Sequence, residues 1–247
     1  MKLSQKQRKL ITSLRQKKYR NQHDLFVVEG IKVIQEFLNS TFELYELFVT
    51  TENAFSNETF TLISEKELKQ ISNLKTPNKA LAIFKIPTES FSDFPGLILV
   101  LDGINDPGNL GTIIRLCDWF GVQQLVCSEN TVDCFNPKVV QSSMGSLTRV
   151  DVQYVNLTEK LSNLSTPVFM ADMDGKSVYD TELPKNSVLV MGNEANGISE
   201  EIKSLTKSII SIPRFGKLQK TESLNVAMAT SILLSEYSRV NSLQKKS

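Results

Sequence analysis

The second half of the chain contains short continuous runs of hydrophobic residues, most of them followed by a loop and a segment with helical spacing. Continuous apolar runs are typical of parallel strands that are covered by helices on both faces. The expected strands are 97–101, 124–127, 168–173, 188–191 and 209–212, and the expected helices begin near Leu110, span 137–147 and 200–205, and begin again at Ser223. This alternation predicts a doubly wound α/β domain, in which ligands bind at the carboxyl ends of the strands.

The first 90 residues predict a smaller α/β unit, with strands at 25–28, 45–50 and 81–86 and a helix at 31–38. Ser64 is expected to cap a further helix, in which Glu67 completes a capping box. Residues 87–96 are rich in turn formers and show no sustained period, which is typical of a linker. We therefore expect two domains, 1–90 and 96–247.

Composition narrows the class of protein without identifying it. The 247 residues carry 28 lysines and arginines against 27 acidic residues, so the net charge of +1 indicates no general attraction to polyanions. The three cysteines lack paired spacing, which supports neither a disulfide framework nor a structural zinc site and fits a reducing compartment. No stretch approaches the roughly 18 apolar residues of a membrane span, so we expect a cytoplasmic protein.

Charge is nevertheless unevenly distributed, because residues 1–20 contain eight basic residues and no acidic one. The basic residues are Lys2, Lys6, Arg8, Lys9, Arg15, Lys17, Lys18 and Arg20. Such a segment attracts polyanions. It is equally the pattern of a solvated helix face above an apolar stripe formed by Leu10, Ile11 and Leu14. The local pattern leaves both interpretations open.

Three loops that follow expected strands contain or lead into most of the candidate functional residues. The first, residues 102–111, contains three glycines and a proline and leads into a helix that carries Arg115, with Asn109 as its expected N-cap. The second, residues 192–197, reads G-N-E-A-N-G and places Glu194 directly after a buried strand. The third spans residues 212–226 and joins the last strand to the last helix.

Each of these residues also has a purely structural explanation. Arg115 can pair with Asp118 or Glu129, and Ser223 or Asn225 can cap the last helix. The lone His23 lies far in sequence from the loops, which disfavours a Ser-His triad and a histidine-ligated metal. The chain also lacks a P-loop, a G-x-G-x-x-G turn and a G-x-S-x-G elbow, which weakens the NTPase, dehydrogenase and hydrolase interpretations.

Taken in order, the three loops resemble the motifs of the SpoU (TrmH-like) RNA 2′-O-ribose methyltransferases. The matching segments are N-D-P-G-N-L-G-T-I-I-R at 105–115, G-N-E-A-N-G at 192–197, and I-P followed by E-S-L-N-V between 212 and 226. The first domain resembles the RNA-binding extension of some members, through F-V-V-E-G at 26–30 and through S-E-K-E-L-K and T-P-N-K-A-L-A-I between 64 and 83. The resemblance covers nearly the whole chain.

The resemblance implies a SPOUT-type α/β-knot fold, in which the C-terminal segment threads through a loop to form a deep trefoil. It also implies an S-adenosyl-L-methionine cofactor, an RNA substrate and a homodimer with its active site near the dimer interface. By motif position, the cofactor pocket is lined by Gly192, Ile212 and Leu224. The positions associated with catalysis are Arg115, Asn105, Glu194, Ser223 and Asn225. The architecture favours ribosomal over transfer RNA, and no metal is expected.

Methyl transfer to a ribose hydroxyl requires an aligned oxygen, methyl group and sulfur, and a means of removing the hydroxyl proton. A guanidinium with a pKa above about 12 is a poor base, so Arg115 is expected to act as a fixed cation that stabilises the developing alkoxide. Glu194 is expected either to orient Arg115 or to accept the proton. Asn105, Ser223 and Asn225 are expected to fix the loops or to receive hydrogen bonds.

The third loop departs from the family pattern, because Arg214 stands where a methionine is common and the loop is longer. The extra length carries Lys217 and Lys220, which together with Arg214 add cations near the expected substrate. Two other functions stay open on the sequence alone. One is an RNA-binding or ribosome-assembly factor of the same fold with little or no turnover, and the other is an α/β enzyme for a small phosphorylated metabolite.

Overall fold

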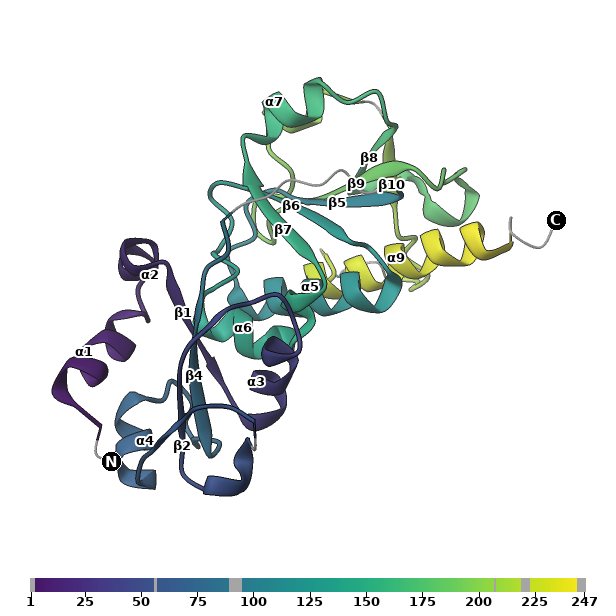
Figure 1. The fold of residues 1–247 in the computed structure, drawn as a ribbon. Helices are drawn as coiled ribbons and strands as arrows, with labels where there is room; N and C mark the ends of the chain where they lie inside the picture. Colours follow the sequence, from purple (N-terminus) through teal and green to yellow (C-terminus); the bar gives the residue numbers. More distant parts are fainter. Residues whose placement is uncertain (1–2, 56, 89–94, 207, 219–222, 244–247) are drawn as a thin grey trace. The chain divides into compact units, whose positions relative to one another are not determined.

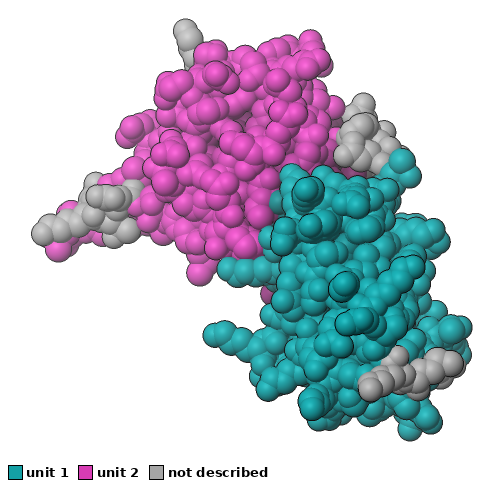
Figure 2. Space-filling view, turned by 90° about the vertical axis from the view of Figure 1, so that its left-hand side faces the viewer, with its two compact units in different colours: residues 1–90, 133–148 teal, residues 91–132, 149–247 magenta. Residues whose placement is uncertain are grey.

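The computed structural model describes residues 3–55, 57–88, 95–206, 208–218 and 223–243. The chain forms two compact units, shown in different colours in Figure 2. Unit 1 consists of Met1–Ser90 together with Asp133–Thr148, and unit 2 consists of Phe91–Val132 together with Arg149–Ser247. A segment of the expected second domain therefore packs with the first. Most of the expected linker, as well as Lys2 and Lys220, lies outside the described residues.

Unit 1 is built on a four-stranded sheet with the order β1-β4-β2-β3, in which β4 is antiparallel to both of its neighbours. Its strands are β1 (Leu25–Glu29), β2 (Leu44–Val49), β3 (Thr61–Leu62) and β4 (Ala80–Lys85). Its helices are α1 (Gln5–Ser13), α2 (Lys17–His23), α3 (Ile31–Leu38), η1 (Glu52–Ala54), α4 (Glu65–Ile71), α6 (Pro137–Ser143) and η2 (Ser146–Thr148). The capping box expected at the start of α4 forms between Ser64 and Glu67.

The segment Asp133–Thr148 completes the interior of unit 1. The ring of Phe135 packs against that of Phe26 with a centroid distance of 4.7 Å, and it also contacts the ring of Phe42. The guanidinium of Arg20 is 1% exposed and forms an ion pair with Asp133. The same guanidinium donates to the backbone oxygens of Leu14 and Arg15, at 2.9 and 3.0 Å. Arg20 is therefore a core residue and not one of the exposed cations that the basic segment suggested.

Unit 2 is built on a six-stranded sheet, parallel throughout, with the order β10-β8-β9-β5-β6-β7 (Figure 1). Its strands are β5 (Leu97–Leu101), β6 (Gln124–Ser128), β7 (Asp151–Val155), β8 (Val168–Ser177), β9 (Ser187–Met191) and β10 (Ile209–Ser211). Its helices are α5 (Pro107–Phe120), α7 (Leu157–Ser162), η3 (Val178–Asp180), α8 (Glu200–Lys203) and α9 (Val226–Leu243). The parallel sheet expected from the continuous apolar runs is confirmed.

Helices cover both faces of this sheet, which explains why its central strands are apolar throughout. On one face, Leu161 of α7 and Ile202 of α8 join a buried cluster with Val100 and Val190 of the strands. On the other face, α5 and α9 pack against each other, and Tyr237 of α9 meets the ring of Phe169 in β8. Figure 1 shows α7 on one side of the sheet and α5 with α9 on the other. No helix in the described ranges is both long and apolar enough to cross a membrane.

Several expected boundaries differ from the structure. Helix α5 begins at Pro107 and is capped by Asp106, whose side chain accepts from the N–H of Asn109 at 2.9 Å, so Asn109 is not the cap. Strand β7 and helix α7 were not expected, because β7 is an edge strand with mostly half-buried residues and its D-V-Q-Y-V sequence forms no apolar run. The last helix begins at Val226 instead of Ser223.

The register of unit 2 brings two of the candidate loops to the same end of the sheet, where the parallel strands finish at their carboxyl ends. Leu101 at the end of β5 lies beside Met191 at the end of β9, and it also lies beside Cys127 of β6. The residues that follow these strands therefore emerge together. Strand β5 has its sequence neighbour β6 on one side and β9 on the other, and such a reversal point is where open α/β sheets bind ligands.

Candidate functional site

The first loop is held in place through the backbone N–H and the backbone carbonyl of Gly103. Its N–H donates to Ser128 Oγ at 2.8 Å, and its carbonyl oxygen accepts from Asn193 Nδ2 at 2.6 Å. Gly103 has a φ of +71°, a left-handed conformation that favours glycine. The loop after β5 is thus tied to the last residue of β6 and to the loop after β9.

The second loop is a closed turn between Asn193 and Gly197, which exchange two backbone hydrogen bonds of 2.9 Å. The side-chain oxygen of Asn193 accepts from the N–H groups of Ala195 and Asn196, at 2.9 and 3.1 Å. A Cβ atom on Gly192 would stand 2.3 Å from the carbonyl carbon of Gly197, which no side chain can tolerate. This turn holds Glu194 exposed at its tip.

Asn109 joins all three loops through its side-chain amide. Its Nδ2 donates to Glu194 Oε1 at 2.5 Å, and its Oδ1 accepts from Asn225 Nδ2 at 3.0 Å. The Oδ1 of Asn225 in turn accepts from the N–H groups of Ala227 and Met228, and so caps helix α9. Three segments that are distant in sequence therefore meet at one side chain of α5.

Arg115 lies six positions after Asn109 on the same helix, and its side chain is exposed. Asp118, the partner that a purely structural role would use, is instead engaged by Arg149, whose Nη2 lies 2.9 Å from Asp118 Oδ2. No hydrogen bond or ion pair joins the side chain of Arg115 to another residue that the structure describes. Glu194 bonds to Asn109 and not to Arg115. The guanidinium is therefore available to a ligand.

Asn105 and Ser223 are both exposed, and each lies close in sequence to a residue that helps to join the loops. Asn105 precedes the N-cap of α5, and Ser223 precedes Asn225 by two positions. Within the described ranges, neither side chain forms a hydrogen bond. Their polar groups are open to solvent or to a substrate.

The three expected cofactor-lining residues lie in the second and third loops. Gly192 and Ile212 directly follow strands β9 and β10 and are half-buried, whereas Leu224 is 50% exposed. Ile212 and Leu224 form no hydrogen bond to another residue in the described part of the chain, so their backbone groups are open. Apolar side chains beside open backbone amides suit a nucleoside, which has an apolar ring face and a polar edge.

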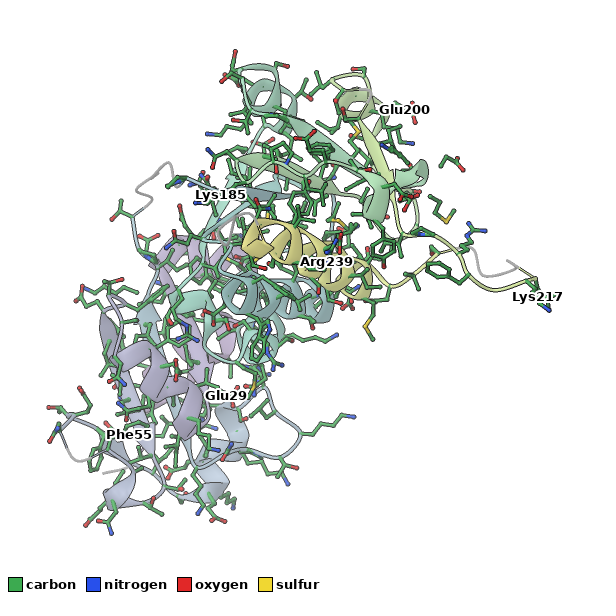
Figure 3. The ribbon with its side chains drawn as sticks, turned by 90° about the vertical axis from the view of Figure 1, so that its right-hand side faces the viewer. Glu29, Phe55, Lys185, Glu200, Lys217 and Arg239 are labelled. Atoms are coloured by element: carbon green, nitrogen blue, oxygen red, sulfur yellow. The ribbon has the colours of Figure 1, made fainter. Side chains whose placement is uncertain are left out.

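The cations of the third loop differ in their surroundings. Nη2 of Arg214 lies 2.9 Å from the sulfur of Met173, so the guanidinium lies beside strand β8. Lys217 stands at the tip of an extended loop that projects away from the sheet (Figure 3). Phe215 and Leu218 on the same loop are 83% and 79% exposed.

Sequence reasoning missed the side chains that hold this site together. The sequence predicts only a helix-capping role for Asn109 and no role for Asn193 or Ser128. Their partners lie 85 and 116 positions from Asn109, 90 positions from Asn193 and 25 positions from Ser128. One signal in the sequence could have indicated a role for two of them. Asn109 and Asn193 both lie inside the motif segments, at 105–115 and 192–197. In the described ranges, no group of three or more His, Cys, Asp or Glu side chains is placed to hold a metal ion.

Comparison with known proteins matches two family models to separate parts of the chain. The family model described as SpoU rRNA Methylase matches residues 96–235, and the model described as an MRM3-like substrate binding domain matches residues 6–82. A 23S rRNA (guanosine(2553)-2′-O)-methyltransferase of Bacillus subtilis is 30% identical over 90% of this chain and 91% of its own length.

Solved structures with this fold cover nearly the whole chain. A structure from Porphyromonas gingivalis that is assigned to the TrmH family of RNA methyltransferases is 38% identical and has a TM-score of 0.87, over 96% of this chain and 98% of that one. An AdoMet-bound rRNA methyltransferase from Sinorhizobium meliloti is 26% identical, with a TM-score of 0.85 over 97% of both chains. The SPOUT-type fold class expected from the sequence is confirmed.

Proposed function

The chain belongs to the SpoU rRNA methylase family, and from this premise we propose that it transfers a methyl group from S-adenosyl-L-methionine to a ribose 2′-hydroxyl of ribosomal RNA. The observation that carries the proposal is the meeting of Glu194 and Asn225 at the side chain of Asn109, with an available guanidinium on the same helix. The AdoMet-bound relative from Sinorhizobium meliloti supports the cofactor.

A guanosine of the large-subunit ribosomal RNA is the substrate to test first. The Bacillus subtilis relative, which matches over most of both chains, is named for guanosine 2553 of 23S rRNA. The match of residues 6–82 to a substrate binding domain supports an RNA partner for the first part of the chain. An enzyme with this substrate works where ribosomes are made, which in bacteria is the cytoplasm.

Arg115 is the group that we assign to the reacting oxygen. The ribose hydroxyl gains negative charge as its proton leaves, and a cation that is already in position stabilises that charge without reorganisation. Arg115 is exposed and is not bound to another described residue, so its guanidinium can approach the sugar oxygen or the adjoining phosphate. Because arginine stays protonated, a different group must take the proton.

Glu194 is the carboxylate in position for that task. One of its oxygens accepts from Asn109 Nδ2, and its other oxygen has no partner among the described residues. The bond to Asn109 limits the rotation of the side chain and leaves the second oxygen able to accept a proton. Asn225 supports Asn109 from the opposite side and acts as a positioning residue.

Gly192, Ile212 and Leu224 are proposed to hold the cofactor through backbone groups and apolar contacts. When bound, the cofactor supplies an activated methyl group on a sulfonium. The closed turn after β9 requires glycine at position 192, so this loop presents its backbone in one fixed conformation. Ile212 and Leu224 contribute apolar surface that a nucleoside ring can cover.

The function is tested by methyl transfer to deproteinised 23S rRNA, with wild-type protein and the variants Arg115→Ala and Arg115→Lys. Loss of a preorganised charge-stabilising group is expected to lower turnover by about 100-fold or more in Arg115→Ala. Cofactor binding, measured by calorimetry, is expected to stay near the wild-type value in both variants.

Wild-type turnover in Arg115→Ala, with normal RNA binding, would exclude this role for the arginine. If the wild-type protein binds RNA and transfers no methyl group, it is instead an RNA-binding or assembly factor of the same fold.

A homodimer is part of the proposal, and exposed apolar side chains of unit 2 support it. Trp119 on α5 is 84% exposed, and Met228 on α9 is 64% exposed. Phe215, Leu218 and Leu224 add further apolar surface in the loop before α9. Aromatic and methionine side chains are enriched at protein interfaces relative to the rest of the surface. Sedimentation equilibrium is expected to give twice the chain mass for the wild type and a smaller average mass for Trp119→Glu, and a monomeric wild type would contradict the assignment.

A further inference from the structure

Three loops of unit 1 meet at one end of its sheet. Strand β4 begins where β1 and β2 end, since Leu81 pairs with Glu29 and Ala80 pairs with Val49. The N–H of Gly30 donates to Ala80 O at 3.0 Å, and the N–H of Thr50 donates to Lys79 O at 2.9 Å. The loop of residues 72–79 therefore lies beside the residues that follow β1 and β2.

The buried carboxylate of Glu29 fixes the start of this loop. Glu29 is 5% exposed and accepts from the hydroxyl of Ser72, from the N–H of Asn73 at 2.7 Å and from Asn73 Nδ2 at 3.0 Å. Its charge faces inward and is satisfied by these donors. The loop is therefore held to the strand without leaving a negative charge on the surface.

Exposed cations lie in these loops and in the first turn of α3 beside them. Lys32 follows β1, and Lys75 and Lys79 lie in the loop before β4, all three exposed. Their ammonium groups form no ion pair within the described ranges. Arg15 of the basic N-terminal segment joins them, because its Nη2 donates to Ser72 O at 3.0 Å.

The acidic residues that follow β2 in this region are Glu52 and Glu58, and residues 72–79 contain none, so little negative charge opposes these cations. Polar groups are interspersed among the cations, because Thr76 and Asn78 are also exposed. None of the large hydrophobic side chains that are exposed in the described part of the chain lies in these loops. Lysines with interspersed hydroxyl and amide groups suit a sugar-phosphate backbone, whereas a protein partner would need apolar anchors.

We propose that Arg15, Lys32, Lys75 and Lys79, here called the loop-end surface, bind the phosphate backbone of the RNA substrate. This inference rests on the proposed function and assigns part of its RNA-binding site. Contacts to phosphates carry no sequence information, so the loop-end surface would orient the RNA on unit 1 without selecting the nucleotide. Three of its four cations lie outside the basic segment that the sequence singles out.

The test compares two double variants that remove the same number of charges. Lys75→Ala/Lys79→Ala changes the loop-end surface, whereas Lys66→Ala/Lys185→Ala changes one exposed lysine of α4 and one exposed lysine in the loop before β9. Binding to deproteinised 23S rRNA is measured by filter retention over a series of KCl concentrations. Cofactor binding and the thermal midpoint are measured for each variant to show that it is folded.

The loop-end variant is expected to bind RNA about 10-fold more weakly, and its plot of log affinity against log salt is expected to be shallower by about 2. The control variant is expected to stay close to the wild type in both quantities. Equal losses in the two variants, or a wild-type salt slope in the loop-end variant, would overturn the inference while methyl transfer by the wild type still supported the proposed function. A wild type that neither binds nor methylates this RNA would overturn both.

Discussion

The side-chain amide of Asn109 donates to Glu194 Oε1 at 2.5 Å across 85 positions of the chain. A carboxylate only accepts hydrogen bonds, and so the nitrogen of the amide must face Glu194 and the oxygen must face Asn225. An asparagine satisfies both neighbours at once, because it carries a donor and an acceptor on one rigid plane. Asn109 therefore sets the relative positions of the two loops that surround the proposed reaction centre.

Replacing Asn109 by aspartate is expected to break this arrangement at constant size. The new carboxylate would face Glu194 with like charge and would have no hydrogen to donate. Because small displacements of reacting groups cost about 100-fold in rate, we expect methyl transfer to fall by about 10- to 100-fold under single-turnover conditions.

The control is Thr112→Ala, which changes an exposed side chain of α5 that bonds to its own helix backbone at Gly108. The control is expected to keep wild-type turnover. Full activity in Asn109→Asp would show that the bond to Glu194 has no part in catalysis.

Loss of the ion pair between Arg20 and Asp133 is expected to loosen unit 1. Asp133→Asn keeps the shape of the side chain and can still accept from the N–H of Phe135, but it leaves the guanidinium of Arg20 buried without its counter-charge. Breaking a buried pair costs about 3 kcal/mol. Amide hydrogen exchange in β1 and β4 of the full chain is expected to accelerate by about 100-fold as a result.

A surface pair provides the comparison for this prediction. Lys85 and Glu43 form an ion pair with side chains that are 48% and 66% exposed, so Glu43→Gln is expected to cost less than about 1 kcal/mol. Exchange rates in β1 that are the same in both variants would mean that Asp133 does not stabilise unit 1.

Gly192→Ala is expected to damage the cofactor loop. The added Cβ would lie 2.3 Å from the carbonyl carbon of Gly197 and 2.4 Å from the N atom of Ile198, and both are backbone atoms that must move. We expect a loss of about 2 kcal/mol in the free energy of unfolding and a clear fall in cofactor affinity by calorimetry. Gly216→Ala, where a Cβ meets no atom within 4 Å, is the matched control and is expected to bind the cofactor normally.

The cysteine thiols are expected to stay unreactive in the native protein. Cys117, Cys127 and Cys134 are all buried, and burial together with the charge of Asp118 raises the pKa of the Cys117 thiol. An ordinary thiol ionises at about pH 8.5, so above this pH the unfolded chain is favoured by releasing a proton that the native protein retains. Stability is therefore expected to fall as the pH rises above about 8.5, and less steeply in Cys117→Val.

Ellman's reagent and urea titrations at several pH values check this prediction. The reagent is expected to detect three thiols in denaturant and almost none in the native protein. Rapid labelling of the native protein, or identical pH profiles for the wild type and Cys117→Val, would contradict it.

The parallel sheet of unit 2 was predictable because burial on both faces leaves a local signature. Strand β9 is buried at every position, and all of its residues after Ser187 form one apolar run in the sequence. Strand β7 at the edge of the sheet is only partly covered, so its sequence mixes polar and apolar residues and gives no such signal. Whether a strand could be predicted from its own residues therefore depended on whether it lies in the centre or at the edge of the sheet.

The sequence by itself determined that motif residues such as Glu194 and Asn225 follow strands or precede helices, because strand and helix signals depend on neighbouring residues. Only the tertiary structure decided that Asn109 connects them, that Arg20 is a core residue and that Arg15 contacts Ser72 in the loop that also carries Lys75. Each of these facts depends on residues far apart in the chain. Local patterns fix the elements, but the register and packing of a completed fold are needed to bring distant side chains within bonding distance.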